Sequence, residues 1–218
     1  MKVSNDEYQV NASTTQHRKM QGYYKLHAKI YDMTRWGFLF GRDTLIEKTK
    51  GKINPKKVLE IGCGTGKNLI KIANSFQNSR IYGLDVSPEM LKITQKKLDD
   101  TGIKAELIEK PYTSPLSKDS DGFDLIVFSY CLSMINPGWE EAIANAQKDL
   151  SDNGIIAVVD FHYSKYDFFR KWMNCNHVKM KSHLLPELEK NFRTEICKIS
   201  RAYLGLWEYL IFIGSKKS

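Results

Sequence analysis

Residues 56–66 read Lys-Lys-Val-Leu-Glu-Ile-Gly-Cys-Gly-Thr-Gly, an apolar strand that runs directly into a glycine-rich turn. A second predicted strand ends in Gly-Leu-Asp-Val at residues 83–86. A strand, a glycine turn, a helix and a second strand that ends in an acidic residue are typical of an α/β sheet that binds a nucleoside. The sequence therefore predicts a cofactor-binding α/β domain.

The spacing of the glycines argues against a dinucleotide. A dinucleotide-binding turn has glycines at its first, third and sixth positions, so that a pyrophosphate can sit on the helix N-terminus. Here they are Gly62, Gly64 and Gly66, and the acidic Glu60 lies two residues before the first of them. This pattern differs from the dinucleotide fingerprint.

Glu-Ile-Gly-Cys-Gly-Thr-Gly resembles the first motif of the class I S-adenosylmethionine-dependent methyltransferases. The resemblance implies that S-adenosyl-L-methionine is bound and that S-adenosyl-L-homocysteine is the product. It places Glu60 near the cationic amino-acid end of the cofactor, and Asp85 on both ribose hydroxyls, a role that suits the two oxygens of a carboxylate. The full set of expected cofactor contacts is Arg35, Arg42, Glu60, Gly62, Cys63, Gly64, Gly66, Asn68, Asp85, Val86, Met90, Pro111, Tyr112 and Ser129.

The adenine end departs from the pattern of that class. Related folds usually place an acidic residue just after the third strand, but this chain has Lys110-Pro111-Tyr112 there. We expect backbone atoms near Tyr112 to bind adenine instead, with Met90 or Val86 packed on the ring.

The order of predicted elements is that of a doubly wound sheet. The expectation is a seven-stranded Rossmann-like methyltransferase sheet whose last strand is antiparallel, preceded by an N-terminal helical arm. Residues 1–50 are expected to form the arm, which contributes to the active site, and residues 51–218 the cofactor-binding domain. Predicted strands cover residues 57–61, 80–86, 105–109, 124–129, 155–160, 195–200 and 206–214; predicted helices cover 68–76, a segment that begins at Ser87, and 139–150, followed by a turn at 151–154.

Composition agrees with one cytoplasmic domain. A chain of 218 residues can bury a single substantial core, and its apolar runs are too short to span a bilayer. The N-terminus lacks the apolar run of a secretory signal, and the four cysteines show no paired spacing, so no metal site is predicted. The net charge of +8 indicates attraction to anionic surfaces without choosing among them.

The arm is rich in aromatic and basic residues. Tyr31, together with Tyr130 after the fourth strand, is a candidate catalytic residue, because aromatic faces stabilise cationic amines. Ordinary packing predicts the same residues. Arg35 and Arg42 can each hold a carboxylate, either of the cofactor or of the acceptor, and surface ion pairs with Asp32 and Asp43 are the alternative.

The segment after the fourth strand limits which class of methyl acceptor is expected. Enzymes that methylate nucleic-acid amino groups carry Asn- or Asp-Pro-Pro-aromatic there, whereas this chain has Ser129-Tyr130-Cys131-Leu132. The paired glutamates of protein arginine methyltransferases are also missing from this segment. Nucleic acid is therefore an unlikely partner, and a small molecule or a lipid is favoured.

A closer resemblance lies outside the glycine motif. The runs 30–35, 38–43, 129–135 and 159–161 look like those of the N-methyltransferases of bacterial betaine-lipid synthesis. That resemblance implies trimethylation of the amino group of diacylglyceryl-homoserine. Phosphatidylethanolamine or a soluble amine as acceptor, an RNA methyltransferase, and a non-catalytic cofactor-binding module remain alternatives, and the oligomeric state stays open.

Residues 163–181 interleave aromatic and basic side chains. Such a segment can lie on an anionic membrane, peripherally at the inner surface. An amphipathic helix that covers a core predicts the same letters. His162 and His177 can assist proton removal from an amine, or serve as structural histidines.

Overall fold

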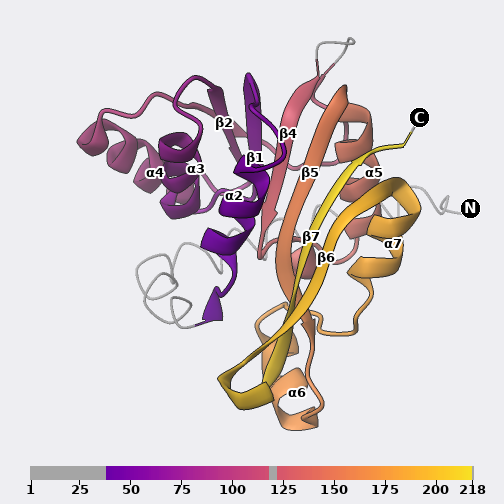
Figure 1. Cartoon of the computed structure of the whole chain (residues 1–218). Helices are drawn as coiled ribbons and strands as arrows, with labels where there is room; N and C mark the ends of the chain where they lie inside the picture. Colours follow the sequence, from indigo (N-terminus) through magenta and orange to yellow (C-terminus); the bar gives the residue numbers. More distant parts are fainter. Residues whose placement is uncertain (1–37, 118–121, 218) are drawn as a thin grey trace, which may run out of the picture.

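The computed structural model describes residues 38–117 and 122–217. This part of the chain contains a seven-stranded sheet in the order β3-β2-β1-β4-β5-β7-β6, with helices on both faces (Figure 1). The strands are β1 (Lys57–Ile61), β2 (Arg80–Asp85), β3 (Glu106–Glu109), β4 (Phe123–Ser129), β5 (Leu150–Tyr163), β6 (Phe192–Ala202) and β7 (Trp207–Lys216). The helices are α2 (Arg42–Lys50), α3 (Lys67–Ser75), α4 (Pro88–Thr101), α5 (Trp139–Asp149), α6 (Asp167–Cys175) and α7 (Leu184–Asn191), with short 3₁₀ turns at Leu132–Met134 and Tyr203–Gly205.

The pairing of the strands confirms the predicted fold class. Strands β1 to β5 are parallel, and β7 pairs antiparallel with both β5 and β6. The strand order reverses between β1 and β4, and ligands of open α/β sheets bind outside the carboxyl ends of the strands at such a switch point. The cofactor site is therefore expected at the carboxyl ends of β1, β2 and β4.

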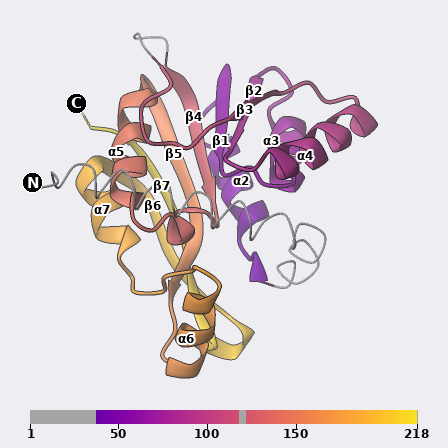
Figure 2. The ribbon, with the colours of Figure 1, turned by 180° about the vertical axis from the view of Figure 1, so that it is seen from behind.

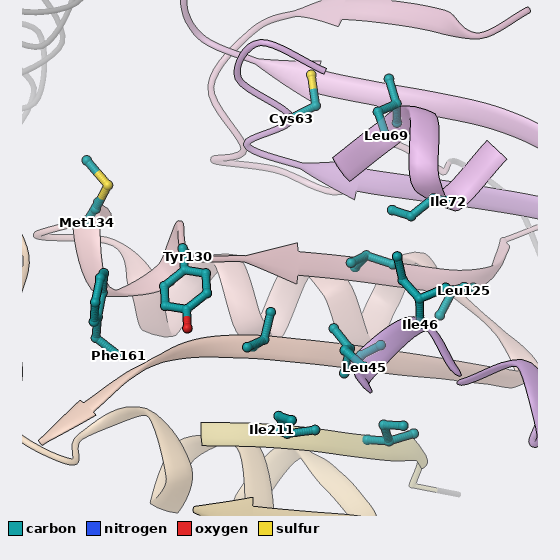
Figure 3. Close-up of a cluster of buried hydrophobic side chains, with 14 of the residues drawn as sticks. Leu45, Ile46, Cys63, Leu69, Ile72, Leu125, Tyr130, Met134, Phe161 and Ile211 are labelled. Carbon is teal, nitrogen blue, oxygen red and sulfur yellow. The ribbon is translucent and has the colours of Figure 1, made fainter. Parts of the chain in front are cut away.

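Alternate residues of the central strands feed two cores. Val58, Leu125 and Val127 face the first core with α2, α3 and α6, while Leu59 and Ile126 face the second core with α5 and α7. This alternation follows from the two-residue period of a strand. Figure 2 shows α3 and α4 on one side of the sheet and α5 and α7 on the other, and Figure 3 shows the first core with Leu45 and Ile46 of α2 packed into it.

The predicted boundaries hold best for the parallel strands. The turn predicted at residues 151–154 lies inside β5 instead, where the pairing with β4 jumps from Leu150 to Ile155. Strand β6 is longer than predicted at both ends, whereas β7 begins one residue later and ends two residues later than predicted. Helix α7 was not predicted as a separate element.

One end of the molecule projects beyond the sheet. Strand β5 continues past β4 to Tyr163 and stays paired with β7, and α6 together with the turn between β6 and β7 lies beyond it (Figure 1). Because β1, β4 and β5 are parallel, this projection lies at the same edge as the glycine turn. Within the described ranges, no helix has both the length and the apolar character needed to cross a bilayer.

Candidate cofactor site

The glycine turn after β1 is held against the end of β2. The backbone N–H groups of Gly62 and Cys63 both donate to the carbonyl oxygen of Leu84, at 2.8 and 3.0 Å. Gly62, Gly64 and Gly66 all have positive φ angles, a conformation that glycine adopts without steric cost. The turn therefore presents main chain rather than side chains at the carboxyl end of β1.

Gly64 and Gly66 have different surroundings. A Cβ atom on Gly66 would lie 2.6 Å from Cγ2 of Thr94, so this glycine lets α4 approach the turn. A Cβ atom on Gly64 would meet no atom of the described residues within 4 Å. The turn thus opens at Gly64, where a ligand can approach the main chain.

Glu60 is a buried carboxylate with one unused oxygen. The residue is 1% exposed, and Asn68 of α3 donates its side-chain amide to Oε1 at 2.7 Å. Among the described residues, Oε2 of Glu60 and Oδ1 of Asn68 have no hydrogen-bond partner. Burial raises the pKa of Glu60 to about 7 against the bond from Asn68 and the nearby charge of Arg42, which lower it. These two buried acceptors therefore have no donor among the described residues. A cationic donor bound here would favour the ionised form of Glu60.

Arg42 links α2 to the end of β4. Its Nε donates to Oγ of Ser129 at 2.7 Å, and its guanidinium lies 5.8 Å from the ring centre of Tyr130. Arg42 also lowers the pKa of Glu60 through its charge. The structure thus brings Arg42, Glu60 and Ser129 to the same end of the sheet.

Asp85 ends β2 and orders the turns on either side of it. Its Oδ2 accepts from the backbone N–H of Gly64 at 2.8 Å, and its Oδ1 accepts from that of Ser87 at 3.0 Å. Burial raises the pKa of Asp85, and the backbone donors oppose that shift. The two carboxylate oxygens together offer about four acceptor sites, so Asp85 keeps capacity for hydroxyl donors beyond its backbone bonds.

The adenine end is less well defined. Met90 is buried in the first turn of α4, which Ser87 caps, and Val86 is half-buried beside Asp85. Tyr112 points elsewhere, since its hydroxyl donates to Asp149 of α5 at 2.6 Å. Pro111 is exposed. The side chain of Tyr112 therefore anchors its loop to α5, and an adenine contact here stays a prediction for the backbone.

Tyr130 is a buried residue whose hydroxyl is occupied. It is 3% exposed, has a φ of 57°, and donates its hydroxyl to the carbonyl oxygen of Phe40 at 2.7 Å. Its ring packs edge-on against Phe161 at 4.7 Å, and Figure 3 shows the two rings at one end of the first core. Burial first, and the charge of Asp160 second, raise the pKa of Tyr130 well above its ordinary value. The hydroxyl is therefore protonated and orders the segment before α2.

Three supporting residues were missed from the sequence. Thr94 donates its hydroxyl to the carbonyl oxygen of Gly64 at 2.7 Å, and Lys97 donates to that of Thr65 at 2.9 Å. Asp160 is fully buried in β5, just after its last pair with β4, and accepts from the backbone N–H groups of Ser133 and Phe161. Burial raises the pKa of Asp160 to about 6. The sequence assigned these residues no role, because each makes a hydrogen bond to a segment about 30 positions away along the chain.

Two predicted site residues, Tyr31 and Arg35, lie outside the described residues. In the described part of the chain, no group of three or more acidic, histidine or cysteine side chains has the arrangement of a metal site. His162 is 8% exposed, and burial lowers its pKa. His177 is exposed and lines a pocket of about 350 Å³ with Asn136 and Lys179.

Comparison with known proteins finds similarity to methyltransferases. The family described as "Methyltransferase domain" matches residues 58–154. The carboxy-S-adenosyl-L-methionine synthase of Campylobacter hominis is 29% identical over 105 residues, which cover 48% of this chain and 44% of that protein. The malonyl-[acyl-carrier protein] O-methyltransferase of a Paenibacillus species is 26% identical over 155 residues, 66% of this chain and 52% of that protein. The chain thus spans about half the length of these curated relatives.

A solved structure with the same fold carries the cofactor product. The N-methyltransferase NodS from Bradyrhizobium japonicum, in complex with S-adenosyl-L-homocysteine, superposes with a TM-score of 0.66 at 17% identity, over 81% of this chain and 86% of that chain. At this identity the likeness concerns the fold alone. The sheet and the glycine turn have the arrangement of the class I S-adenosylmethionine-dependent methyltransferase fold, and residues 58–154 match the methyltransferase domain family. S-adenosyl-L-methionine is the methyl donor of this class, and S-adenosyl-L-homocysteine its product.

Proposed function

We propose that this protein transfers methyl groups from S-adenosyl-L-methionine to the amino group of a lipid head group, with diacylglyceryl-homoserine as the acceptor. The observation that carries the methyltransferase part is the pair of buried acceptors without a partner among the described residues, Oε2 of Glu60 and Oδ1 of Asn68, beside the opening at Gly64. These groups fit a cofactor whose amino-acid end is a cation.

Each residue of the site has a defined part in holding that cofactor. Glu60 and Asn68 would accept from its ammonium group, and Asp85 from its ribose hydroxyls. Gly64 would lie against it through main-chain atoms, and Arg42 would pair with its carboxylate. The cofactor supplies a methyl group on a sulfonium, so the protein has to align the acceptor and exclude water.

The acceptor side of the site favours positioning over acid-base catalysis. The Tyr130 hydroxyl is engaged by Phe40 and has a raised pKa, so it does not serve as a base near neutral pH. A neutral amine needs no base to attack a methyl group, because its lone pair is already available. An amine acceptor is therefore consistent with the groups present at the end of β4.

The lipid part of the proposal rests on two other observations. The runs 30–35 and 38–43 resemble those of betaine-lipid N-methyltransferases. An exposed group of aromatic and basic side chains also lies at the same edge of the sheet as the site. Phosphatidylethanolamine is the second lipid acceptor that these observations allow.

The test follows methyl label into lipid. Purified full-length protein is incubated with methyl-labelled S-adenosyl-L-methionine and vesicles that contain either diacylglyceryl-homoserine or phosphatidylethanolamine, and the organic phase is counted. The Asp85→Ala variant serves as the control for label that arrives without turnover. We expect label in the homoserine lipid only.

Other outcomes redirect the assignment. Label in phosphatidylethanolamine alone would replace the proposed acceptor by the second one. No lipid label despite measurable cofactor binding would contradict a lipid acceptor and point to soluble amines, RNA or a regulatory module. Failure to bind the cofactor at all would contradict the methyltransferase assignment itself.

A further inference from the structure

Four large apolar side chains stand in solvent at the projecting end of the molecule. Phe168 and Trp172 of α6 are 67% and 50% exposed, and Tyr203 and Leu204 of the β6–β7 turn are 54% and 110% exposed. We call these four residues the aromatic tip. Figure 1 shows that α6 and this turn form the part of the ribbon farthest beyond the sheet.

Helix α6 has two apolar stripes, although its packing against the core uses only one. Phe169 and Met173 form the buried stripe and belong to the first core. Phe168 and Trp172 have the same spacing of four residues, but they form a second stripe that faces solvent. A surface helix needs a single apolar face to attach to its domain, so the second stripe is available for a partner.

The turn between β6 and β7 presents leucine in an unfavourable place. Tyr203 and Leu204 have φ angles of 46° and 55°, in the left-handed region that non-glycine residues rarely adopt. A polar residue or glycine would suit both the backbone and the solvent better. Because Leu204 is fully exposed, packing within the described residues does not explain why a leucine occupies this position.

Two residues of the aromatic tip, Tyr203 and Trp172, pack against aromatic side chains of the core. The buried Trp207 stacks on Phe169 at 5.4 Å and lies 4.8 Å from the ring of Tyr203. Phe38 stacks on the other side of this group, 5.0 Å from Trp207 and 5.9 Å from Trp172. A rigid apolar surface loses little conformational freedom when it binds.

The charges around the aromatic tip are mainly positive. Asp167 pairs with Arg170, and Glu208 pairs with Arg201 at 3.6 Å. Basic residues on these two segments outnumber those acidic ones, and no ion pair to a carboxylate is seen among the described residues for three of them, Lys165, Lys171 and Lys198. Cations around an apolar centre complement the anionic head groups and acyl chains of a membrane.

The aromatic tip is also continuous with the candidate site. Phe40 accepts the hydrogen bond from Tyr130 through its carbonyl oxygen, and its ring packs edge-on against Tyr203 at 5.3 Å. The two features thus share one residue at the carboxyl edge of the sheet. A surface bound at the aromatic tip would lie next to the end of β4.

We infer that the aromatic tip is a docking site for an anionic lipid surface, with Phe168, Trp172 and Leu204 inserted between head groups and Lys165 and Lys171 on the phosphates. This inference adds an interaction surface to the proposed function. Its test requires neither cofactor binding nor methyl transfer, so the two can fail separately.

The test is sedimentation of the full-length protein with vesicles. One set contains phosphatidylcholine alone, and the other contains equal parts of phosphatidylcholine and phosphatidylglycerol. We expect sedimentation with the anionic set, which weakens as salt is raised. Because each side chain loses its buried apolar area, Phe168→Ser and Leu204→Gly should each weaken this binding about tenfold.

Two comparisons separate docking from unfolding and from bulk charge. Leu204→Gly suits the left-handed backbone, so its melting temperature should not fall below that of the unmodified protein. Lys171→Glu lies at the aromatic tip, whereas Lys148→Glu makes the same charge change on an exposed position of α5 at the opposite edge of the sheet. Only the change at Lys171 should weaken sedimentation strongly.

Three results would overturn the inference. The unmodified protein could fail to sediment with anionic vesicles. Both lysine variants could lose binding equally, which would assign the effect to net charge. Leu204→Gly could abolish a concentration-dependent dimer without vesicle binding, which would assign the aromatic tip to a second copy of the chain.

Discussion

Asn68 of α3 donates its side-chain amide to the carboxylate of Glu60 in β1 across 2.7 Å, in a place where both side chains are buried. The bond uses Oε1 of Glu60 and the amide nitrogen of Asn68, and it leaves Oε2 of Glu60 and Oδ1 of Asn68 without a donor among the described residues. A buried carboxylate with a free oxygen is costly unless a ligand completes it. The pair therefore supports the proposal that the cofactor binds at the end of β1.

The pH dependence of stability should report on Glu60. Its pKa is raised by burial from 4.5 to about 7, so between these values the folded protein without cofactor binds a proton that the unfolded chain releases. The contribution of Glu60 is therefore fully present below pH 4.5 and is lost as the pH rises through about 7. Thermal melts of Glu60→Gln should lack this decline. Equal slopes for both proteins would contradict a raised pKa at Glu60.

The same residue should link cofactor binding to pH. An ammonium group binds the ionised carboxylate, so below the pKa of about 7 binding must release a proton. The affinity for S-adenosyl-L-methionine should then fall by up to about tenfold per pH unit. Calorimetry on Glu60→Gln should show a weaker affinity that no longer depends on this titration. A pH-dependent loss that persists unchanged in Glu60→Gln would assign it to another group.

Asp85 should contribute to affinity as well as to local order. Replacing it by alanine removes a charged acceptor, and hydrogen bonds to charged groups contribute about 1.5–3 kcal/mol each. The affinity for S-adenosyl-L-methionine should fall by at least about tenfold in calorimetry. Asp100→Ala is the matched control, because that carboxylate is exposed on α4 and pairs only with Lys96 among the described residues. Unchanged affinity in a folded Asp85→Ala protein would refute the cofactor assignment.

The sequence predicted what depends on local patterns. The strand at 58–61, which is apolar except for Glu60, the glycines that follow it and the acid at Asp85 predicted the sheet class and the edge at which the cofactor is expected, because each element is encoded by neighbouring residues. The bulge at 151–154 was missed, since the pairing of Leu150 with Phe123 extends β5 across a stretch that reads as a turn. Helix α7 was missed because only Leu184 and Leu188 form its buried stripe.

The residues of the candidate site also divide into those that local sequence patterns predicted and those that depend on distant contacts. Glu60, Asn68 and the glycines come from one continuous segment and were predicted together. The bond between Arg42 and Ser129 joins residues 87 positions apart, and Asp160 reaches Ser133 across 27 positions. Such contacts depend on how the strands align, so the sequence could nominate Arg42 and Ser129 without placing them together, and it included Asp160 only within the run 159–161, without a role of its own.

Tyr130→Phe should reduce stability without removing an aromatic ring. The change deletes the 2.7 Å hydrogen bond to the carbonyl oxygen of Phe40. A typical internal hydrogen bond contributes about 1 kcal/mol, so chemical denaturation should show a loss of that size. Tyr209→Phe is the control, because no hydroxyl bond of Tyr209 is seen within the described ranges, although its ring stacks on Phe40 at 6.2 Å. Equal losses for both variants would remove the special role of the Tyr130 hydroxyl.

Tyr31 remains a prediction from the sequence. If its ring stabilises the cationic product, Tyr31→Phe should keep methyl transfer, whereas Tyr31→Ala should lose most of it. Rates measured at saturating cofactor separate this effect from cofactor binding. Full activity in both variants would remove Tyr31 from the site.

Gly64 and Gly102 form a matched pair for testing the opening in the glycine turn. Both have left-handed backbones, with φ angles of 55° and 67°, and at both positions an added Cβ atom would meet no described atom within 4 Å. Gly102 ends α4, away from the turn after β1, so Gly102→Ala measures the backbone cost alone. That cost is about 1 kcal/mol for a residue with a side chain in this conformation.

Gly64→Ala should therefore lower the free energy of unfolding by about 1 kcal/mol, as Gly102→Ala does. It should differ from Gly102→Ala in affinity, because its methyl group would project into the space in which S-adenosyl-L-methionine is proposed to lie against the main chain. We expect calorimetry to show a strongly weakened affinity for Gly64→Ala and an unchanged one for Gly102→Ala. If both bind the cofactor like the unmodified protein, the space at Gly64 is open solvent, and the cofactor must approach the turn from another side.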